Sequence, residues 1–223
     1  MTTSQLHPGQ RVLMGPAPRF GLPRYVRAEF DIPEAAQVRI AGQVDEAFTL
    51  TRASLDVLPE VSMDSDLHCV MTWSAVGTGW TGWRFTDLWE RRLRDHAADD
   101  TTHLVFSGLD GAVASIEVGD LLRDDVMLAH SREGAPLGRA YGAPYRLVVP
   151  HLYGYKHIKH VCAIELTDHH VRGPHEPWIM HRRGRVAEEE RSGLGMARVT
   201  RSINRAFVTR ALRSYGVDKP RFR

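Results

Sequence analysis

The 223-residue sequence contains two cysteines, and each has to be considered as a single thiol. Cys69 lies in the run DLHCVMTWS, where an apolar strand-like segment leads into the turn-forming run SAVGTG. A thiolate presented at a strand end beside a loop can bind a soft metal ion, whereas a lone cysteine within a strand is more often a small buried hydrophobe. Spacing alone favours the buried hydrophobe. Cys162, in the apolar run HVCAIEL, is predicted to be a buried structural thiol.

A second group of chemically active residues lies between Tyr141 and Val161, in the run YGAPYRLVVPHLYGYKHIKHV. The chain has 26 arginines but only three lysines, and two of these, Lys156 and Lys159, fall in this stretch together with Arg146. Fixed positive charges near glycines suit a phosphate, because glycine lets a ligand approach the backbone N–H groups. A solvated basic hairpin would have the same composition, and the residues alone do not separate the two.

Taken together, DLHCVMTWS and YGAPYRLVVPHLYGYKHIKHVCAIELTD resemble the two signature segments of the sulfite oxidase-type molybdopterin-binding oxidoreductases, in the order in which that family has them. A weaker resemblance extends from Val38 to Asp168. The resemblance implies a mixed-sheet α+β fold, a molybdenum–molybdopterin cofactor and Cys69 as the protein ligand to the metal. Relatives without a haem domain are the better match.

The resemblance also implies roles for individual residues. The cofactor would be bound by Arg19, Phe20, Cys69, Ser107, Tyr141, Arg146, His157, Ile158 and Lys159. Arg146 and Lys159 would neutralise the cofactor phosphate through charge-assisted hydrogen bonds. His157 and Ile158 would offer backbone N–H groups, and Ser107 would contribute a hydroxyl contact to the pterin.

The sequence departs from the family pattern at Tyr141, where an asparagine is expected before Gly-Ala-Pro, and from Arg172 onward, where nothing matches. These departures put the substrate in doubt rather than the cofactor. On the substrate side, Trp73 could line the open face of the metal, and the candidate catalytic residues are His68, Cys69, His151 and Tyr153. A histidine of ordinary pKa suits proton donation to an oxo group that becomes water.

The reaction implied by the resemblance is a two-electron oxygen-atom transfer on a small substrate such as sulfite, a sulfoxide or an N-oxide. No CxxCH haem motif or flavin fingerprint occurs in the sequence, so a separate electron-transfer protein is expected. Two other hypotheses stay open: a non-catalytic binding module that uses the basic C-terminal tail, and a Cys/His zinc protein. The zinc ligands would come from His157, His160, Cys162, His169, His170, His175 and His181. Their spacing fits no established zinc motif, and on a strand the first two would point to opposite faces.

Charge is distributed unevenly along the chain. From Arg172 to the end there are 13 basic and five acidic residues, a net charge of +8, while the first 171 residues carry a net charge of −6. We expect weak nucleic-acid binding, because no nucleic-acid motif accompanies the basic residues. A helix is predicted at 195–215, and its apolar stripe should be covered by the same chain or by a second copy. The stripe consists of Met196, Val199, Ile203 and Phe207.

The chain is predicted to have an extended lead-in (1–30), a molybdopterin-binding domain (31–171) and a basic C-terminal extension with one helix (172–223). Strands are expected at 37–44, 68–73, 104–106, 113–118, 145–149 and 158–166. Helices are expected at 87–95, with Thr86 as N-cap, and at 118–129, and Ser54 is expected to cap a short turn. Because helices do not alternate regularly with strands, the pattern favours α+β over a doubly wound parallel sheet.

Composition excludes several classes of protein. Hydrophobic residues make up 43% and charged residues 25% of the chain, which is unlike disordered, collagen-like or disulfide-rich proteins. No apolar run approaches the ~20 residues of a membrane helix, and the N-terminal residues lack a signal-peptide pattern. We therefore expect a soluble protein that stays in the cytoplasm.

Overall fold

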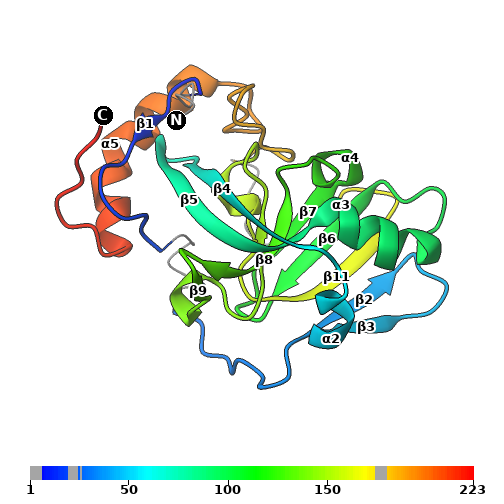
Figure 1. Cartoon of the computed structure of the whole chain (residues 1–223). Helices are drawn as coiled ribbons and strands as arrows, with labels where there is room; N and C mark the ends of the chain where they lie inside the picture. The colour runs from blue at the N-terminus through cyan, green and yellow to red at the C-terminus, as the bar shows by residue number, and fades with distance from the viewer. Residues whose placement is uncertain (1–6, 20–24, 26, 174–179) are drawn as a thin grey trace.

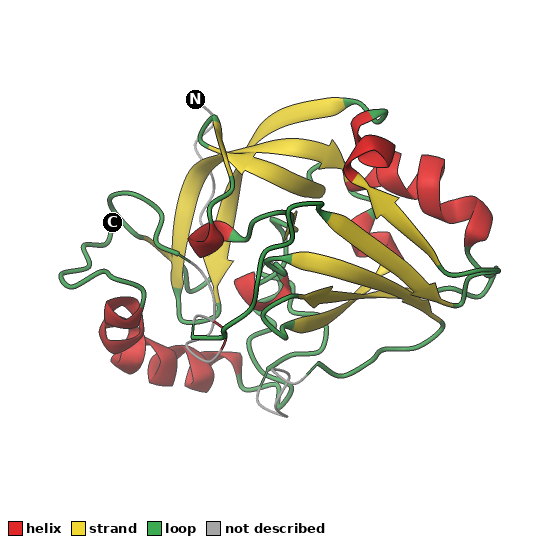
Figure 2. Ribbon diagram, turned by 90° about the horizontal axis from the view of Figure 1, so that it is seen from below, coloured by secondary structure: helices red, strands yellow, loops and turns green. Residues whose placement is uncertain are grey.

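The computed structural model describes residues 7–19, 25, 27–173 and 180–223, which form two β-sheets with helices at their ends (Figure 1). Figure 2 shows the sheets as two layers, with the longest helix at one end of the molecule and a group of short helical turns at the other. Both sheets contain parallel and antiparallel pairs, so the structure has the mixed α+β architecture that the sequence predicts.

The first sheet carries Cys69. Its strands are β1 (Arg11–Val12), β4 (Glu60–Cys69), β5 (Trp73–Arg84), β8 (Met127–Arg132), β9 (Ala135–Pro136) and β10 (Arg146–Val148). β5 is the central strand, since it pairs antiparallel with β4 and β8 and parallel with β1. Gly82 allows the close approach of β5 and β8, because a Cβ at this position would lie 2.2 Å from the carbonyl oxygen of Leu128.

The second sheet has five strands. In spatial order they are β3 (Phe48–Thr51), β2 (Gln37–Gly42), β11 (Val161–Thr167), β6 (His103–Gly108) and β7 (Val113–Glu117). β2 and β11 run parallel, and the other neighbours run antiparallel. The two sheets share one hydrophobic core, to which both contribute fully buried side chains: Ile40, Trp83, Phe106, Leu128, Leu147 and Ile164.

Apart from one, the helices are short. α2 (Arg52–Asp56) is capped by Thr51, whose Oγ1 accepts a hydrogen bond from the backbone N–H of Ser54 (3.2 Å). The prediction of Ser54 as the cap is therefore wrong, since Ser54 lies inside the helix. α3 (Phe85–Leu88) continues into a π-helical turn (Trp89–Leu93) and a 3-10 turn (Arg94–His96), in the segment where a helix is predicted. Two further 3-10 turns cover Arg139–Tyr141 and Gly154–Lys156.

The predicted helix at 118–129 is wrong. Only α4 (Val118–Leu121) is helical, and the chain from Met127 onward forms β8. β8 pairs with β5 on one side and β10 on the other, and Met127, Leu128 and Ala129 are fully buried there. Backbone pairing within the sheet overrides an apolar spacing that also suited a helix.

Two predicted strands have different bounds in the structure. The segment predicted at 68–73 is the end of β4, a turn at 70–72 and the start of β5, and the strand predicted at 158–166 begins only at Val161. β3 and most of β4 and β5 are not among the predicted strands, because Ser, Thr, Asp and Gly interrupt the apolar alternation in these runs.

The C-terminal extension contains α5 (Ala197–Ser214), which lies beside β1 and the lead-in (Figure 1). Val208 and Leu212 are buried in a second hydrophobic cluster that includes Trp73 of β5, and Leu13 of the lead-in pairs with Phe222 near the end of the chain. The apolar stripe of Met196, Val199, Ile203 and Phe207 is 49–55% exposed. The same chain therefore does not cover the stripe, because the helix turns a different face inward; of the two predicted alternatives, cover by a second copy stays a prediction.

Candidate functional site

Cys69 lies at the end of β4, at the start of a tight turn into β5. The backbone N–H of Thr72 donates to the carbonyl oxygen of Cys69 (3.1 Å), and Thr72 adopts a φ of 71°. A β-branched residue rarely occupies this left-handed region, and strain of this kind is concentrated at functional sites. Trp73, which pairs with Cys69 across the hairpin, is fully buried.

Both ends of the chain cover this turn. Gln10 Nε2 donates to the carbonyl oxygen of Cys69 (3.1 Å), and Arg191 Nη1 and Asn204 Nδ2 both donate to that of Val70 (2.6 and 3.0 Å). Burial raises the pKa of the Cys69 thiol to about 11. The lead-in and the C-terminal extension therefore fix the backbone next to the candidate metal ligand.

His68 and Tyr153 lie beside Cys69. The two residues form a parallel β-bridge, and His68 Nδ1 lies 2.7 Å from Ser74 Oγ. The Ser74 hydroxyl donates to Gln10 Oε1 (3.0 Å), so His68 Nδ1 donates to Ser74 and Nε2 carries the lone pair of the neutral ring. Burial, with a smaller effect of the nearby His7, lowers the pKa of His68 to about 4.

Arg146 and Lys159 form a buried basic cluster. Arg146 is completely buried and its Nη1 donates to the carbonyl oxygen of Tyr141 (3.1 Å), while Lys159 is 7% exposed and its Nζ donates to that of Ala140 (3.0 Å). Burial, and then repulsion from Arg146, lowers the pKa of Lys159 to about 8. Burial, and then repulsion from Arg132, lowers the pKa of Arg146 to about 9. The cluster is thus electrostatically unfavourable without an anion.

A pocket of about 320 Å³ opens onto Lys159. It is lined by Arg19, Tyr25, Phe30, Arg139, Ala140, Lys159 and His160. Arg19, predicted from a short motif in the lead-in, is therefore placed next to Lys159. Phe20 lies outside the described residues. Three cationic side chains around one pocket are suited to a phosphate.

Gly142 and the backbone at Ile158 lie next to Lys159, which lines this pocket. Gly142 has a φ of 111°, and a Cβ on it would lie 3.0 Å from the Cβ of Lys159. Within the described chain, the N–H groups of Ile158 and Lys159 enter no backbone–backbone hydrogen bond, which leaves them available to a ligand. The backbone N–H of His157, which is predicted to contact the cofactor, instead donates to Gly154 O (3.2 Å) and closes a 3-10 turn.

His157 links the thiol end of the site to the basic end. It is buried, and its Nε2 lies 3.3 Å from the carbonyl oxygen of Leu152. Burial, and then the charge of Arg146, lowers its pKa to about 3, and His68 acts on it in the same direction. Tyr141 and Cys69 also pack against the same hydrophobic cluster. The predicted residues from both signature segments are therefore brought together.

Ser107, Lys156 and Cys162 lie outside the basic cluster of Arg146 and Lys159. Ser107 is on β6, next to Gly108, where a Cβ would lie 2.3 Å from the carbonyl oxygen of Lys159. Lys156 is fully buried and its Nζ donates to Ser115 O (2.9 Å), so it supports the fold. Cys162 is only partly buried, contrary to the prediction, because it sits at a register shift of β11; its thiol donates to Ser107 O (3.4 Å).

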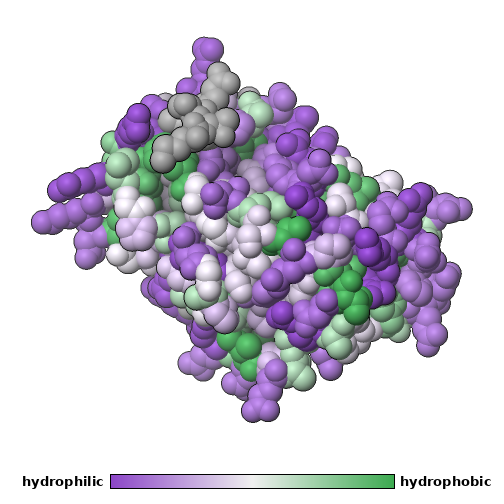
Figure 3. Space-filling view, in the orientation of Figure 1, coloured by the Kyte–Doolittle hydropathy of each residue, from purple (hydrophilic) through white to green (hydrophobic). Residues whose placement is uncertain are grey.

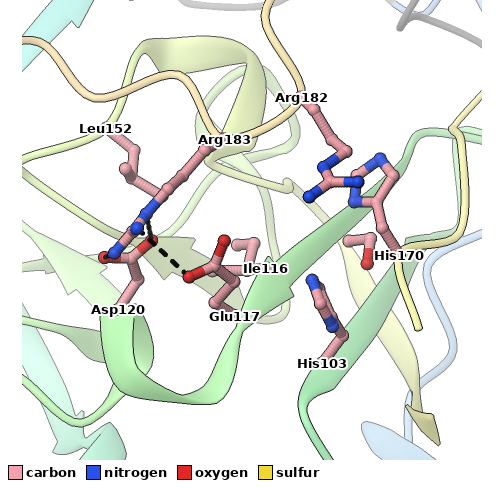
Figure 4. Close-up of a pocket in the computed structure, with 9 residues that line it drawn as sticks. His103, Ile116, Glu117, Asp120, Leu152, His170, Arg182 and Arg183 are labelled. Atoms are coloured by element: carbon pink, nitrogen blue, oxygen red, sulfur yellow. Dashed lines mark hydrogen bonds and ion pairs between the residues drawn. The ribbon is translucent and has the colours of Figure 1, made fainter. Parts of the chain in front are cut away.

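His151 contacts a different group of charged residues. Its Nε2 lies 3.4 Å from Asp120 Oδ1, and Arg183 donates to both oxygens of Asp120 (2.8 and 3.0 Å). Although burial raises the pKa of Asp120, these hydrogen bonds lower it well below its usual range. Figure 4 shows Arg183 directed at Asp120 and Glu117, beside a cavity of about 10 Å³, which is too small for a substrate.

The two alternative hypotheses find little support. Among the described residues, no group of three or more His, Cys, Asp or Glu side chains is arranged to hold a metal ion. Four arginines of the tail form ion pairs with carboxylates of the same chain: Arg183, Arg185, Arg191 and Arg201. Four of the 13 basic residues of the tail are therefore neutralised by carboxylates of the same chain.

Residues 25–175 match the family described as the oxidoreductase molybdopterin binding domain, which is more than half of the chain. The chain belongs to this family. The sequence is 27% identical over 152 residues to the uncharacterized oxidoreductase YuiH of Bacillus subtilis, covering 63% of this chain and 74% of YuiH. It is 31% identical over 138 residues to a putative protein-methionine-sulfoxide reductase subunit, YedZ1, of Azospira oryzae, covering 61% of this chain and 51% of that protein.

The fold resembles that of the sulfane dehydrogenase SoxCD of Paracoccus pantotrophus. The TM-score is 0.56 at 18% sequence identity, and the match covers 79% of this chain and 56% of the SoxCD chain. The predicted sulfite oxidase-type fold is confirmed by this similarity. The chain spans about half the length of both SoxCD and YedZ1.

The family implies a molybdenum–molybdopterin cofactor, and the residues of this chain fit it. A phosphate in the pocket would offset the burial and the repulsion from Arg146 that lower the pKa of Lys159. A soft thiolate at the other end of the site suits a redox-active metal. The protein is therefore a molybdopterin-dependent oxidoreductase. Within the described residues, no helix has the length and apolar character needed to cross a membrane.

Proposed function

We propose that the protein catalyses two-electron oxygen-atom transfer on a small substrate at a molybdenum centre whose protein ligand is the thiolate of Cys69. One observation carries this proposal: the first signature segment presents the single thiol of Cys69 at a strand end beside the strained Thr72, and the second buries two cations, Arg146 and Lys159, near each other. Neither a zinc site nor a nucleic-acid-binding module would explain the two features together.

The residues of the basic cluster are proposed to bind the cofactor by its phosphate. Arg146 and Lys159 would donate charge-assisted hydrogen bonds, and Arg19 would close the pocket from the lead-in. The N–H groups of Ile158 and Lys159 would complete the phosphate site. At the other end, loss of the thiol proton on metal binding would overcome the high pKa of the free Cys69 thiol.

The substrate is proposed to bind beside His68 and Tyr153. The cofactor supplies a redox-active metal that can take an oxygen atom from the substrate or give one to it. The Tyr153 phenol could donate a hydrogen bond to the oxygen that is transferred. The His68 ring, whose Nε2 carries the lone pair, could accept one once that oxygen is protonated. Arg191 lies over the Tyr153 ring (5.1 Å) and holds it in place. The contact of His151 with Asp120 suggests that it positions the loop that carries Tyr153.

The electron balance requires an electron donor or acceptor besides the substrate. Reduction of a sulfoxide or N-oxide consumes two electrons and two protons and releases water. Oxidation of sulfite takes its oxygen from water and releases two electrons and two protons. Because the chain has no haem or flavin motif, we propose that a separate electron-transfer protein supplies or accepts these electrons.

The proposal is tested by pairing Cys69→Ser with Cys162→Ser in a host that makes the cofactor. Wild-type protein and Cys162→Ser should contain molybdenum and pterin in equal amounts and should be active, and Cys69→Ser should lose all activity, because a hydroxyl is a poor ligand for a soft metal. Activity is measured with a viologen dye and dimethyl sulfoxide, methionine sulfoxide or trimethylamine N-oxide, and with sulfite and ferricyanide. Full metal content and activity in Cys69→Ser would contradict the assignment of the ligand.

A further inference from the structure

The four side chains of the apolar stripe on α5 project away from the protein. Met196, Val199, Ile203 and Phe207 are 49, 51, 53 and 55% exposed, while Val208 and Leu212 on the opposite face of the helix are buried. In Figure 3, hydrophobic side chains lie between hydrophilic ones at the end of the molecule where α5 is located. An exposed row of four large apolar side chains is characteristic of an interaction surface.

The charged residues of α5 are all arginines. No Asp or Glu occurs between Glu190 and Asp218, and α5 itself contains five arginines. Arg210 lies three residues after Phe207 and seven after Ile203, so it is on the same face as the stripe, and Arg213 follows at its edge. Both arginines are exposed, and neither forms an ion pair in the described part of the chain.

The buried side of α5 lies directly against the Cys69 turn. Asn204 of α5 donates to the carbonyl oxygen of Val70 (3.0 Å), and Tyr215, at the end of the helix, packs in the hydrophobic cluster that Cys69 contacts. The exposed stripe is therefore separated from this turn by one helix, whose diameter is about 10–12 Å. An electron carrier on the stripe would come close to the metal ligand without entering the substrate site.

We propose that the exposed stripe of α5 and its flanking arginines form the docking site for a small acidic electron-transfer protein, which exchanges two electrons with the molybdenum centre one at a time. This inference rests on the proposed function. Four half-exposed side chains present at most roughly 400 Å², about half of what each partner buries in a stable complex, and such a small area suits a transient redox encounter. Two copies of this chain meeting through α5 would place arginine against arginine, which disfavours a symmetric dimer.

The test uses flavodoxin and plant-type ferredoxin as acidic carriers and cytochrome c as a basic one. Three variants are compared with the wild type: Ile203→Ser/Phe207→Ser, Arg210→Glu/Arg213→Glu, and the control Arg39→Glu. Arg39 is also an exposed arginine, but it lies on β2 at the far end of the molecule (Figure 1). Rates are measured with each carrier and with a small dye, and binding is measured on cofactor-free protein at low and high salt.

The wild type and Arg39→Glu should bind an acidic carrier in a salt-sensitive manner and should not bind cytochrome c. Both stripe variants should lose at least tenfold in carrier binding and carrier-driven rate, with unchanged dye-driven rate and melting temperature. Unchanged carrier binding in the variants, or no salt-sensitive binding by the wild type, would overturn the inference. The inference would also be overturned if the wild type formed a dimer in sedimentation that the stripe variants do not form. The same holds if the stripe bound phosphatidylglycerol vesicles but no carrier. Because carrier binding is measured on cofactor-free protein, the docking site can be confirmed even if the proposed oxygen-transfer activity is not found.

Discussion

Replacing Lys159 by methionine should stabilise the cofactor-free protein and weaken its hold on the cofactor. Lys159 is 7% exposed and its stem packs against Gly142. Methionine keeps an unbranched stem of similar length and removes only the charge and its hydrogen bonds. The two effects have opposite signs because the same charge is unfavourable in the empty pocket and favourable beside a phosphate.

The size of each effect follows from the pKa. Burial and the charge of Arg146 lower the pKa of Lys159 from 10.5 to about 8. At neutral pH this corresponds to a penalty of at most about 3 kcal/mol for the charged form in the folded protein. Losing the hydrogen bond to Ala140 costs about 1 kcal/mol, since this exposed residue can turn to water, so the net gain should be about 1–2 kcal/mol. Loss of a charge-assisted contact to phosphate costs about 1.5–3 kcal/mol, which is roughly a 10- to 150-fold weaker affinity.

The pH dependence gives the prediction a second test. The penalty is fully present below pH 8, where Lys159 is charged in the folded protein, and it falls as the pH rises from about 8 towards 10.5, because the folded state has already lost the proton that the unfolded state still holds. The stability advantage of Lys159→Met should therefore shrink across this range. Urea unfolding of cofactor-free protein measures it, and molybdenum retained after dialysis measures the affinity.

Lys156→Met is the matched control. Lys156 is also buried, but its Nζ donates to the buried carbonyl oxygen of Ser115, outside the basic pocket. This variant should be less stable by about 1–3 kcal/mol with or without cofactor, because it leaves that carbonyl unsatisfied. If Lys159→Met destabilised the empty protein and kept its cofactor as Lys156→Met does, the assignment of Lys159 to the phosphate would be refuted.

Three further variants test other parts of the structure. Cys162→Ala should lose about 1 kcal/mol of stability and retain its molybdenum, since the thiol is only partly buried; loss of metal by elemental analysis would reveal a second site. Asp120→Asn should be less stable than the wild type above pH 4, where the hydrogen-bonded carboxylate stabilises the fold. This difference should shrink as the pH falls below the usual Asp pKa towards the lower pKa of Asp120 in the folded protein. A difference that stays constant in acid unfolding would argue against the ion pair. Arg191→Met should cost about 1–3 kcal/mol, because it removes the buried ion pair with Glu189 and one of the two hydrogen bonds to the carbonyl oxygen of Val70, while Arg201 and Asn204 keep their contacts with these groups; a thermal shift under 2 °C would contradict this.

The cofactor end of the site could be predicted from the sequence because its residues are close in the chain and each has a distinctive chemistry. Arg146, Ile158 and Lys159 fall in one short run, and the structure places Lys159 in a pocket with Arg19, near the buried Arg146. The backbone role of His157 could not be predicted, since the 3-10 turn that uses its N–H has no sequence signal beyond Gly154.

The prediction of parts of the fold was wrong for a different reason. The run from Val118 to Ala129 has helical spacing, and only pairing with strands distant in sequence makes its second half a strand. The contact of His151 with Asp120, like that of Gln10 with Cys69, depends on tertiary packing that composition does not encode. The cytoplasmic location stays a prediction, because no feature of the described fold bears on it.

The C-terminal extension shows how an unfamiliar sequence can belong to the same site. Its charge suggested a separate function, yet Arg191 and Asn204 donate to the carbonyl oxygen that follows Cys69, and Tyr215 packs beside it. Arg191 and Arg201 on that side are paired with Glu189, whereas Arg210 and Arg213 on the outer face are not paired within the described chain. One segment therefore has two faces with different chemistry: the inner face fixes the backbone at the thiol, and the outer face keeps the charge and apolar surface that an acidic electron carrier requires.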